Sequence, residues 1–143
     1  MKEIRSEIEV EALGTIVWKV LVDFQRYKEW NPFIYSISGE AIVGQKIRIN
    51  LRTPSGKERN YEPVITKADV DRELRWIGKS FFLNGEHVFS LEDTKPGFTR
   101  FVQSEIFRGP LSRFFGEGTG KDITSGIEQM NLALKRRAEL AHE

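Results

Sequence analysis

The sequence of 143 residues contains no cysteine and only two histidines, His87 and His142. Without cysteine the chain can form no disulfide bond, no thiolate metal site and no cysteine nucleophile. Two histidines so far apart in the sequence make no metal-ligand pattern, and we expect neither a metal ion nor a cofactor. The G-x-S-x-G sequence that positions a serine nucleophile is missing as well. Several classes of enzyme are therefore excluded.

The chain also lacks an excess of charge of either sign and any long apolar run. Twenty-two basic residues against 21 acidic ones leave a formal net charge of +1, without the one-sided basic stripe that a nucleic-acid-binding protein needs. No stretch of about 18 apolar residues is present that could span a bilayer. Because the N-terminal segment shows no apolar signal-peptide region, we expect a cytoplasmic protein without stable membrane insertion.

Apolar and charged side chains alternate at the beginning of the chain. Ile4, Ile8 and Val10 alternate with glutamate and arginine residues, a pattern typical of a strand with one buried face. Further strands are predicted at 33–39, 45–53, 59–68, 72–80, 86–93 and 98–108, separated by turn-forming residues. Alternation of this kind favours an antiparallel sheet, here of about seven strands.

Two segments show helical periodicity instead. Residues 14–24 have apolar side chains at three- and four-residue spacing, and Pro32 cannot continue a helix. Residues 119–140 repeat the pattern and form one apolar stripe, which must be covered by the sheet. The sequence therefore predicts one α+β domain over 1–143, with a curved antiparallel sheet, one or two short helices after the first strand and a long C-terminal helix across the sheet.

Two neighbouring predicted strands carry polar side chains among apolar ones. His87 shares a face with Phe89, and Gln103 and Glu105 share a face with Phe107. A hairpin between these strands would bring His87 next to Gln103 or Glu105. The polar groups could fix the polar end of a bound molecule, or they could merely satisfy one another as buried partners. Proton transfer by His87 and Glu105 is a further possibility.

Aromatic side chains are numerous, and some of them lie beside predicted turns, where the mouth of a cavity would be built. The segment 109–118, which has two phenylalanines between glycines, is predicted to act as a gate. Together with the stripe of the last helix, these observations define the candidate ligand-binding residues. They are Trp30, Phe33, Trp76, His87, Phe89, Gln103, Glu105, Phe107, Phe114, Ile127 and Met130.

A resemblance to a known superfamily extends over nearly the whole chain. It rests on VWKVLVDFQRYKEWNPF at 17–33, LRWIG at 74–78, GEHVFSLED at 85–93 and TRFVQSEIFRGPL at 99–111. In their order and spacing these segments resemble the START-like superfamily, also called SRPBCC, helix-grip or polyketide cyclase/dehydrase-like, and above all its small single-domain members. The resemblance implies a helix-grip fold, in which the sheet wraps around the C-terminal helix and a ligand cavity lies between them.

The resemblance leaves three functions open. The protein could bind or carry a small hydrophobic or amphipathic molecule, such as a lipid, a polyketide or an aromatic compound. It could be a cyclase- or dehydratase-type enzyme in which His87 and Glu105 move protons, or a protein-interaction module like the relatives that activate a heat-shock ATPase. We favour a small hydrophobic ligand as the partner and leave open whether a reaction is catalysed. The oligomeric state is left open between a monomer and a weak dimer.

Overall fold

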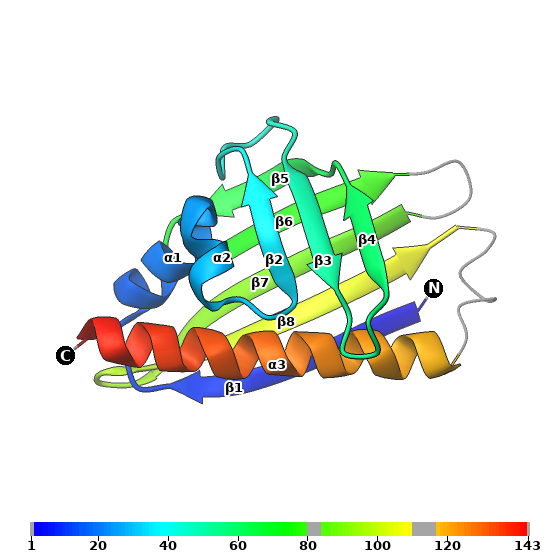
Figure 1. The fold of residues 1–143 in the computed structure, drawn as a ribbon. Coiled ribbons are helices and arrows are strands. Elements are labelled where there is room, and N and C mark those ends of the chain that lie inside the picture. The colour runs from blue at the N-terminus through cyan, green and yellow to red at the C-terminus, as the bar shows by residue number, and fades with distance from the viewer. Residues whose placement is uncertain (1, 80–83, 110–116, 143) are drawn as a thin grey trace.

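The computed structural model describes residues 2–79, 84–109 and 117–142 and has an α+β architecture (Figure 1). The elements are, in chain order, β1 (Lys2–Val10), α1 (Gly14–Val22), the 3-10 turn η1 (Phe24–Arg26), α2 (Tyr27–Trp30), β2 (Ile34–Ser38), β3 (Arg48–Arg52), β4 (Glu58–Tyr61), β5 (Val64–Asp69), β6 (Glu73–Lys79), β7 (Asn84–Lys95), β8 (Phe98–Arg108) and α3 (Glu117–His142). The expected fold class is confirmed.

The strands form two antiparallel ladders within the described part of the chain, in the orders β1-β8-β7-β6-β5 and β2-β3-β4. Backbone hydrogen bonds join the ladders, because Gly44 N–H donates to the carbonyl of Ile65 and Ile47 N–H donates to that of Pro63. The strand expected at 59–68 is thus two strands, β4 and β5. The chain changes ladder at Pro63, which has no N–H to donate to a sheet.

Helix α3 lies along the sheet and packs on β1 and α1 (Figure 1). It extends two residues beyond each end of the predicted helix. The apolar stripe seen in the sequence is buried along its length; its members are Ile123, Ile127, Met130, Leu134 and Ala138. Covering this stripe is what holds the helix on the sheet, since buried apolar area stabilises by roughly 25 cal/mol per Å².

The connection from the first strand to the second ladder turns sharply at Asn31. The predicted helix at 14–24 ends at Val22, and η1 and α2 follow it. The side-chain oxygen of Asn31 accepts hydrogen bonds from the backbone N–H groups of Phe33 and Ile34, both at 2.9 Å. This turn stops the helix, as Pro32 predicted, and starts β2 with Phe33 directed toward α3.

Candidate ligand-binding pocket

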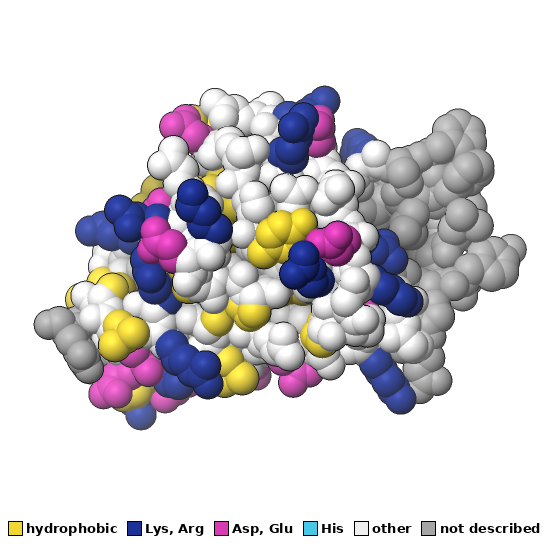
Figure 2. Space-filling model, viewed as in Figure 1, with side chains coloured by type: hydrophobic (Ala, Val, Ile, Leu, Met, Phe, Trp, Pro, Cys, Tyr) yellow, Lys and Arg dark blue, Asp and Glu magenta, His cyan; other side chains and the backbone are white. Residues whose placement is uncertain are grey.

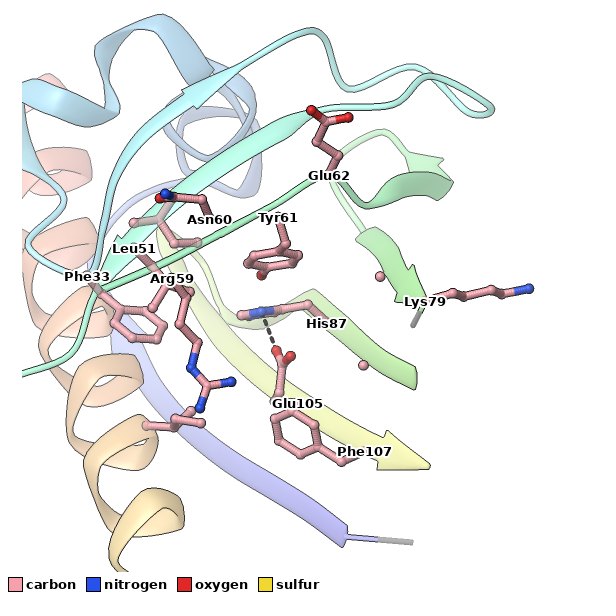
Figure 3. A pocket seen from close by; sticks show the side chains of 14 residues that line it. Phe33, Leu51, Arg59, Asn60, Tyr61, Glu62, Lys79, His87, Glu105 and Phe107 are labelled. Carbon is pink, nitrogen blue, oxygen red and sulfur yellow. Dashed lines mark ion pairs between the residues drawn. The ribbon is translucent and has the colours of Figure 1, made fainter. Parts of the chain in front are cut away.

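A cavity of about 540 Å³ lies between the second ladder, the ends of β6, β7 and β8, and α3. The side chains in Figure 3 that line it come from all of these elements. They belong to Phe33, Ile34, Leu51, Arg59, Asn60, Tyr61, Glu62, Gly78, Lys79, Gly85, His87, Glu105, Phe107 and Ile123. Because Arg59, Glu62 and Lys79 are exposed, the cavity reaches the surface, while its deeper wall is mostly apolar.

The polar part of this wall is formed by His87 on β7 and Glu105 on β8. The two residues face each other directly across the ladder, and their side chains are only 3% and 13% exposed. Nδ1 of His87 lies 2.5 Å from Oε2 of Glu105, the contact drawn as a dashed line in Figure 3. The structure therefore brings together the two residues that the strand pattern singled out.

A chain of hydrogen bonds continues from His87 into the interior. Nε2 of His87 lies 2.8 Å from Oε1 of Gln103, whose Nε2 donates to Oδ1 of Asn131 at 2.6 Å. Nδ2 of Asn131 donates in turn to the hydroxyl of Ser6 at 3.2 Å. Asn131 was missed by the sequence analysis. Its signal was a polar residue four positions after Ile127, on the buried face of α3.

Two aromatic rings pack against the imidazole of His87 on the side away from the cavity. The imidazole stacks on Phe89, with ring centroids 4.2 Å apart and an interplanar angle of 15°. The Trp76 ring lies 5.3 Å from the imidazole and 5.0 Å from Phe89. Trp76 and Phe89 are themselves buried in the core. These contacts restrict the orientation of the imidazole, so that its hydrogen-bonding direction is set by the fold.

Tyr61 on β4 lies above His87 and Glu105 in the same cavity (Figure 3). Burial and the charge of Glu105 both raise the pKa of the Tyr61 phenol. The phenol is therefore a protonated hydrogen-bond donor at neutral pH. The sequence analysis missed this residue, although a tyrosine among the charged and polar residues of Glu58–Tyr61 was a visible signal.

Two contacts fix the second ladder to α3. The ring of Phe33 lies against Gly126 so closely that a Cβ at Gly126 would be 2.4 Å from it. Asp122 accepts hydrogen bonds from the backbone N–H of Ser55 at 3.0 Å and from its hydroxyl at 2.6 Å. Hydrogen bonds from Ser55 and Thr53 hold the pKa of Asp122 below its usual range. The turn between β3 and β4 is thus tied to the helix beside the cavity.

The structure separates the predicted ligand-binding residues into three groups. Four line the cavity, namely Phe33, His87, Glu105 and Phe107. Six others do not line it: Trp30 packs on the core from its edge, and Trp76, Phe89, Gln103, Ile127 and Met130 are buried behind it. Phe114 and residues 110–116 of the predicted gate lie outside the described residues. Direct ligand contact stays a prediction for all three groups.

The surface shows no segregation of charge on the face in Figure 2, where basic and acidic side chains are interspersed with apolar ones. In the part of the chain that the structure describes, no group of three or more potential ligand side chains is arranged to hold a metal ion. Within the same ranges, no helix combines the length and the apolar character needed to cross a membrane.

Comparisons with known proteins agree with this architecture. No curated protein sequence matches the chain. Solved structures with the same fold include a START superfamily protein from Mycobacterium smegmatis, with a TM-score of 0.75, 17% identity and coverage of 97% of this chain and 98% of that one. The protein TTHA0849 from Thermus thermophilus has a TM-score of 0.78 and 15% identity over 99% of this chain and all of its own (100%).

A third similar structure is the di-domain ARO/CYC BexL from the BE-7585A biosynthetic pathway. Its TM-score is 0.67 at 13% identity, and the match covers 99% of this chain and 50% of that one. At these identities the structural matches show the fold alone. The sequence itself matches the family described as polyketide cyclase/dehydrase and lipid transport over residues 1–139. The chain is therefore a member of the polyketide cyclase/dehydrase and lipid transport family.

Proposed function

We propose that the protein binds a small hydrophobic or amphipathic molecule in the cavity between α3 and the two ladders. The observation that carries this proposal is the cavity itself, whose volume of about 540 Å³ lies in the range of roughly 300–1,000 Å³ that small-molecule sites occupy. Its mostly apolar wall with a few polar groups is the composition expected of such a site. Membership of a family that includes lipid transport proteins supports the same function.

The arrangement of the polar groups favours an amphipathic ligand. Arg59 and Lys79 are exposed at the mouth, whereas His87 and Glu105 lie at the inner wall. Phe33, Leu51 and Phe107 supply apolar surface between them. A molecule with an apolar body can therefore be oriented by hydrogen bonds at its inner end while burial of its body supplies most of the affinity.

The proposal is tested by filling the cavity. Ile123 lines it from α3, and Leu132 is a 48% exposed residue of the same helix. We expect the wild type and Leu132→Trp to bind the neutral fluorescent probe N-phenylnaphthylamine saturably, and Ile123→Trp to lose about tenfold or more in affinity, because the indole occupies the space of the probe. Equal affinity of all three proteins, or no saturable binding at all, would contradict the proposal.

A cyclase- or dehydratase-type activity is the second candidate, and the contact between His87 and Glu105 at the cavity wall favours it. A cavity that orients a reactive chain beside a proton-transferring pair can accelerate ring closure or loss of water. The test is turnover of a synthetic linear poly-β-ketone. An enzyme would lose most of its rate in Glu105→Gln, whereas a carrier would bind the compound and leave its rate of cyclisation unchanged.

A further inference from the structure

The buried hydrogen-bond chain behind the cavity has a direction. Asn131 donates through Nδ2 to Ser6 and accepts through Oδ1 from Gln103. The amide nitrogen of Gln103 is therefore engaged on the helix side, and its carbonyl oxygen Oε1 is the atom that faces His87. A carbonyl oxygen can only accept a hydrogen bond. Nε2 of His87 must then carry a hydrogen and donate it.

This direction determines what lies between His87 and Glu105. With Nε2 as a donor, a neutral imidazole has only a lone pair at Nδ1, and the 2.5 Å contact would set that lone pair against a carboxylate oxygen. Such a contact is stable only with one proton between the two atoms. The pair therefore holds one shared proton, either as imidazolium and carboxylate or as imidazole and carboxylic acid. Its net charge is zero in both forms.

The second oxygen of Glu105, Oε1, belongs to a residue that lines the cavity. Oε2 makes the contact with His87, and within residues 2–79, 84–109 and 117–142 no hydrogen bond to Oε1 is found. It lies beside Gly85, where a Cβ would be 3.5 Å away, and both residues line the cavity. Among the described residues, Gly85 therefore places no side chain between Oε1 and the cavity. Tyr61, a protonated phenol, faces the same space.

We propose that His87 and Glu105 form a net-neutral site that binds the hydroxyl group of a neutral phenol or enol. The ligand hydroxyl donates to Oε1 of Glu105 and accepts from the phenol of Tyr61. Gln103 and Asn131 are positioning residues. Gln103 contacts His87, Asn131 contacts Gln103, and neither residue lines the cavity. This inference rests on the proposed function, because it names the chemical class of the ligand for the same cavity.

A hydroxyl suits this site better than a charged group does. A carboxylate ligand would meet the unprotonated oxygen of Glu105, and an ammonium ligand could donate to that oxygen but has no lone pair to accept the hydrogen bond from Tyr61. A hydroxyl both donates and accepts. It therefore matches a site that offers one acceptor, Oε1 of Glu105, and one donor, the phenol of Tyr61. The binding site is thus specific for hydrogen-bonding pattern as well as for apolar shape.

The first experiment compares naphthol with naphthalene, which differ only in the hydroxyl group. We expect the wild type to bind naphthol about tenfold more tightly, the gain that one hydrogen bond to a charged group can supply, and to bind naphthoate more weakly than naphthol. Gln103→Met should reduce the preference for naphthol to about threefold or less, because His87 and Glu105 are no longer held in position. Ser104→Ala, a half-buried neighbour on the same strand, should keep the full preference.

The second experiment reads the protonation of His87 directly. The chain has only two histidines, so a nitrogen-15 spectrum of the wild type and of His142→Gln assigns the His87 signals. We expect a protonated Nε2 and a hydrogen-bonded proton at Nδ1 shared with Glu105. In Gln103→Met the Nε2 signal should change, whereas a residue that only stabilised the fold would lower the melting temperature and leave this signal in place.

The outcomes separate this inference from the proposed function. Binding of neither naphthol nor naphthalene would overturn both. Equal binding of the two compounds, or tighter binding of naphthoate, would overturn the inference and leave the hydrophobic container intact. A His87 with its hydrogen at Nδ1 alone would mean that the hydrogen-bond chain runs in the opposite direction, and would overturn the inference without any variant.

Discussion

The two halves of α3 face interiors of different density. Toward the C-terminus the helix buries Leu134 and Ala138 completely against closely packed side chains. Toward the N-terminus, Ile123 borders the cavity and Gly126 supports the ring of Phe33. The same sheet and the same helix therefore enclose a filled core at one end and an open cavity at the other.

Side-chain size accounts for this difference. The filled end contains large buried rings in edge-to-face contact, such as Phe24 with Tyr27 at 5.6 Å and Phe24 with Trp76 at 6.3 Å. Around the cavity, glycines stand where side chains would otherwise project. A Cβ at Gly78 would lie 3.2 Å from the ring of Tyr61, and one at Gly126 would lie 2.4 Å from Phe33. At both glycines the neighbouring ring packs directly against the backbone, so that a side chain there would push the ring away.

The largest expected effect is a difference in the free energy of unfolding between variants at the two ends of α3. Leu134→Ala removes a fully buried side chain from the filled end and should lower the free energy of unfolding by about 3 kcal/mol, the usual cost of a new cavity in a core. Ile123→Ala, nearer the N-terminus of α3, enlarges an existing cavity and should cost about 1 kcal/mol. Urea unfolding of both variants measures the difference, and equal losses would show that the two ends are equally packed.

A smaller effect is expected at Gly126, where the helix meets Phe33. Alanine at this position raises helix propensity by about 1 kcal/mol, but its Cβ would displace the Phe33 ring toward the cavity. We expect Gly126→Ala to bind N-phenylnaphthylamine several-fold more weakly than the wild type. Gly118→Ala is the matched control on the same helix, because a Cβ there meets nothing within 4 Å, and it should bind the probe normally. Unchanged binding by Gly126→Ala would mean that Phe33 does not border the ligand.

The smallest effect concerns the link between Asp122 and Ser55 at the open end. Because the pKa of Asp122 is lowered in the folded protein, its contribution to stability is fully present above the ordinary value of 3.8 and is lost as the pH falls through the lower folded-state value. The stability difference between the wild type and Asp122→Asn should therefore shrink below about pH 4. Urea unfolding over this range provides the measurement, and a difference independent of pH would refute a role for the charge.

The sequence was sufficient for those features that depend on local periodicity. The alternation in Lys2–Val10 and the stripe from Ile123 to Ala138 predicted β1 and α3, because each element must bury one face. The hairpin of β7 and β8 could also be predicted, since a short turn places His87 next to Gln103 or Glu105; the structure pairs His87 with Glu105. The division of 59–68 into β4 and β5 was missed, although Pro63 was visible, because both halves have strand propensity.

The candidate site was less accessible to prediction for a physical reason. Asn131 contacts Gln103 from α3, and Asp122 contacts Ser55 from the same helix, across long separations in the chain. Neither contact has a local pattern. Similarly, Trp76 and Phe33 are both buried aromatic residues, but only Phe33 lines the cavity. Which of two such residues meets a ligand depends on how the second ladder bends over the first.

Residue order and periodicity were therefore enough to predict the α+β class, most of the strands and the long last helix, and to place His87 next to Gln103 or Glu105, because each follows from the burial of one face of a helix or strand. The position of the cavity at one end of α3, its lining by Tyr61 and Arg59, and the hydrogen-bond chain from Gln103 to Asn131 followed only from the packed molecule. Space between elements is a property of how distant side chains fit together, and no segment of the chain encodes it alone.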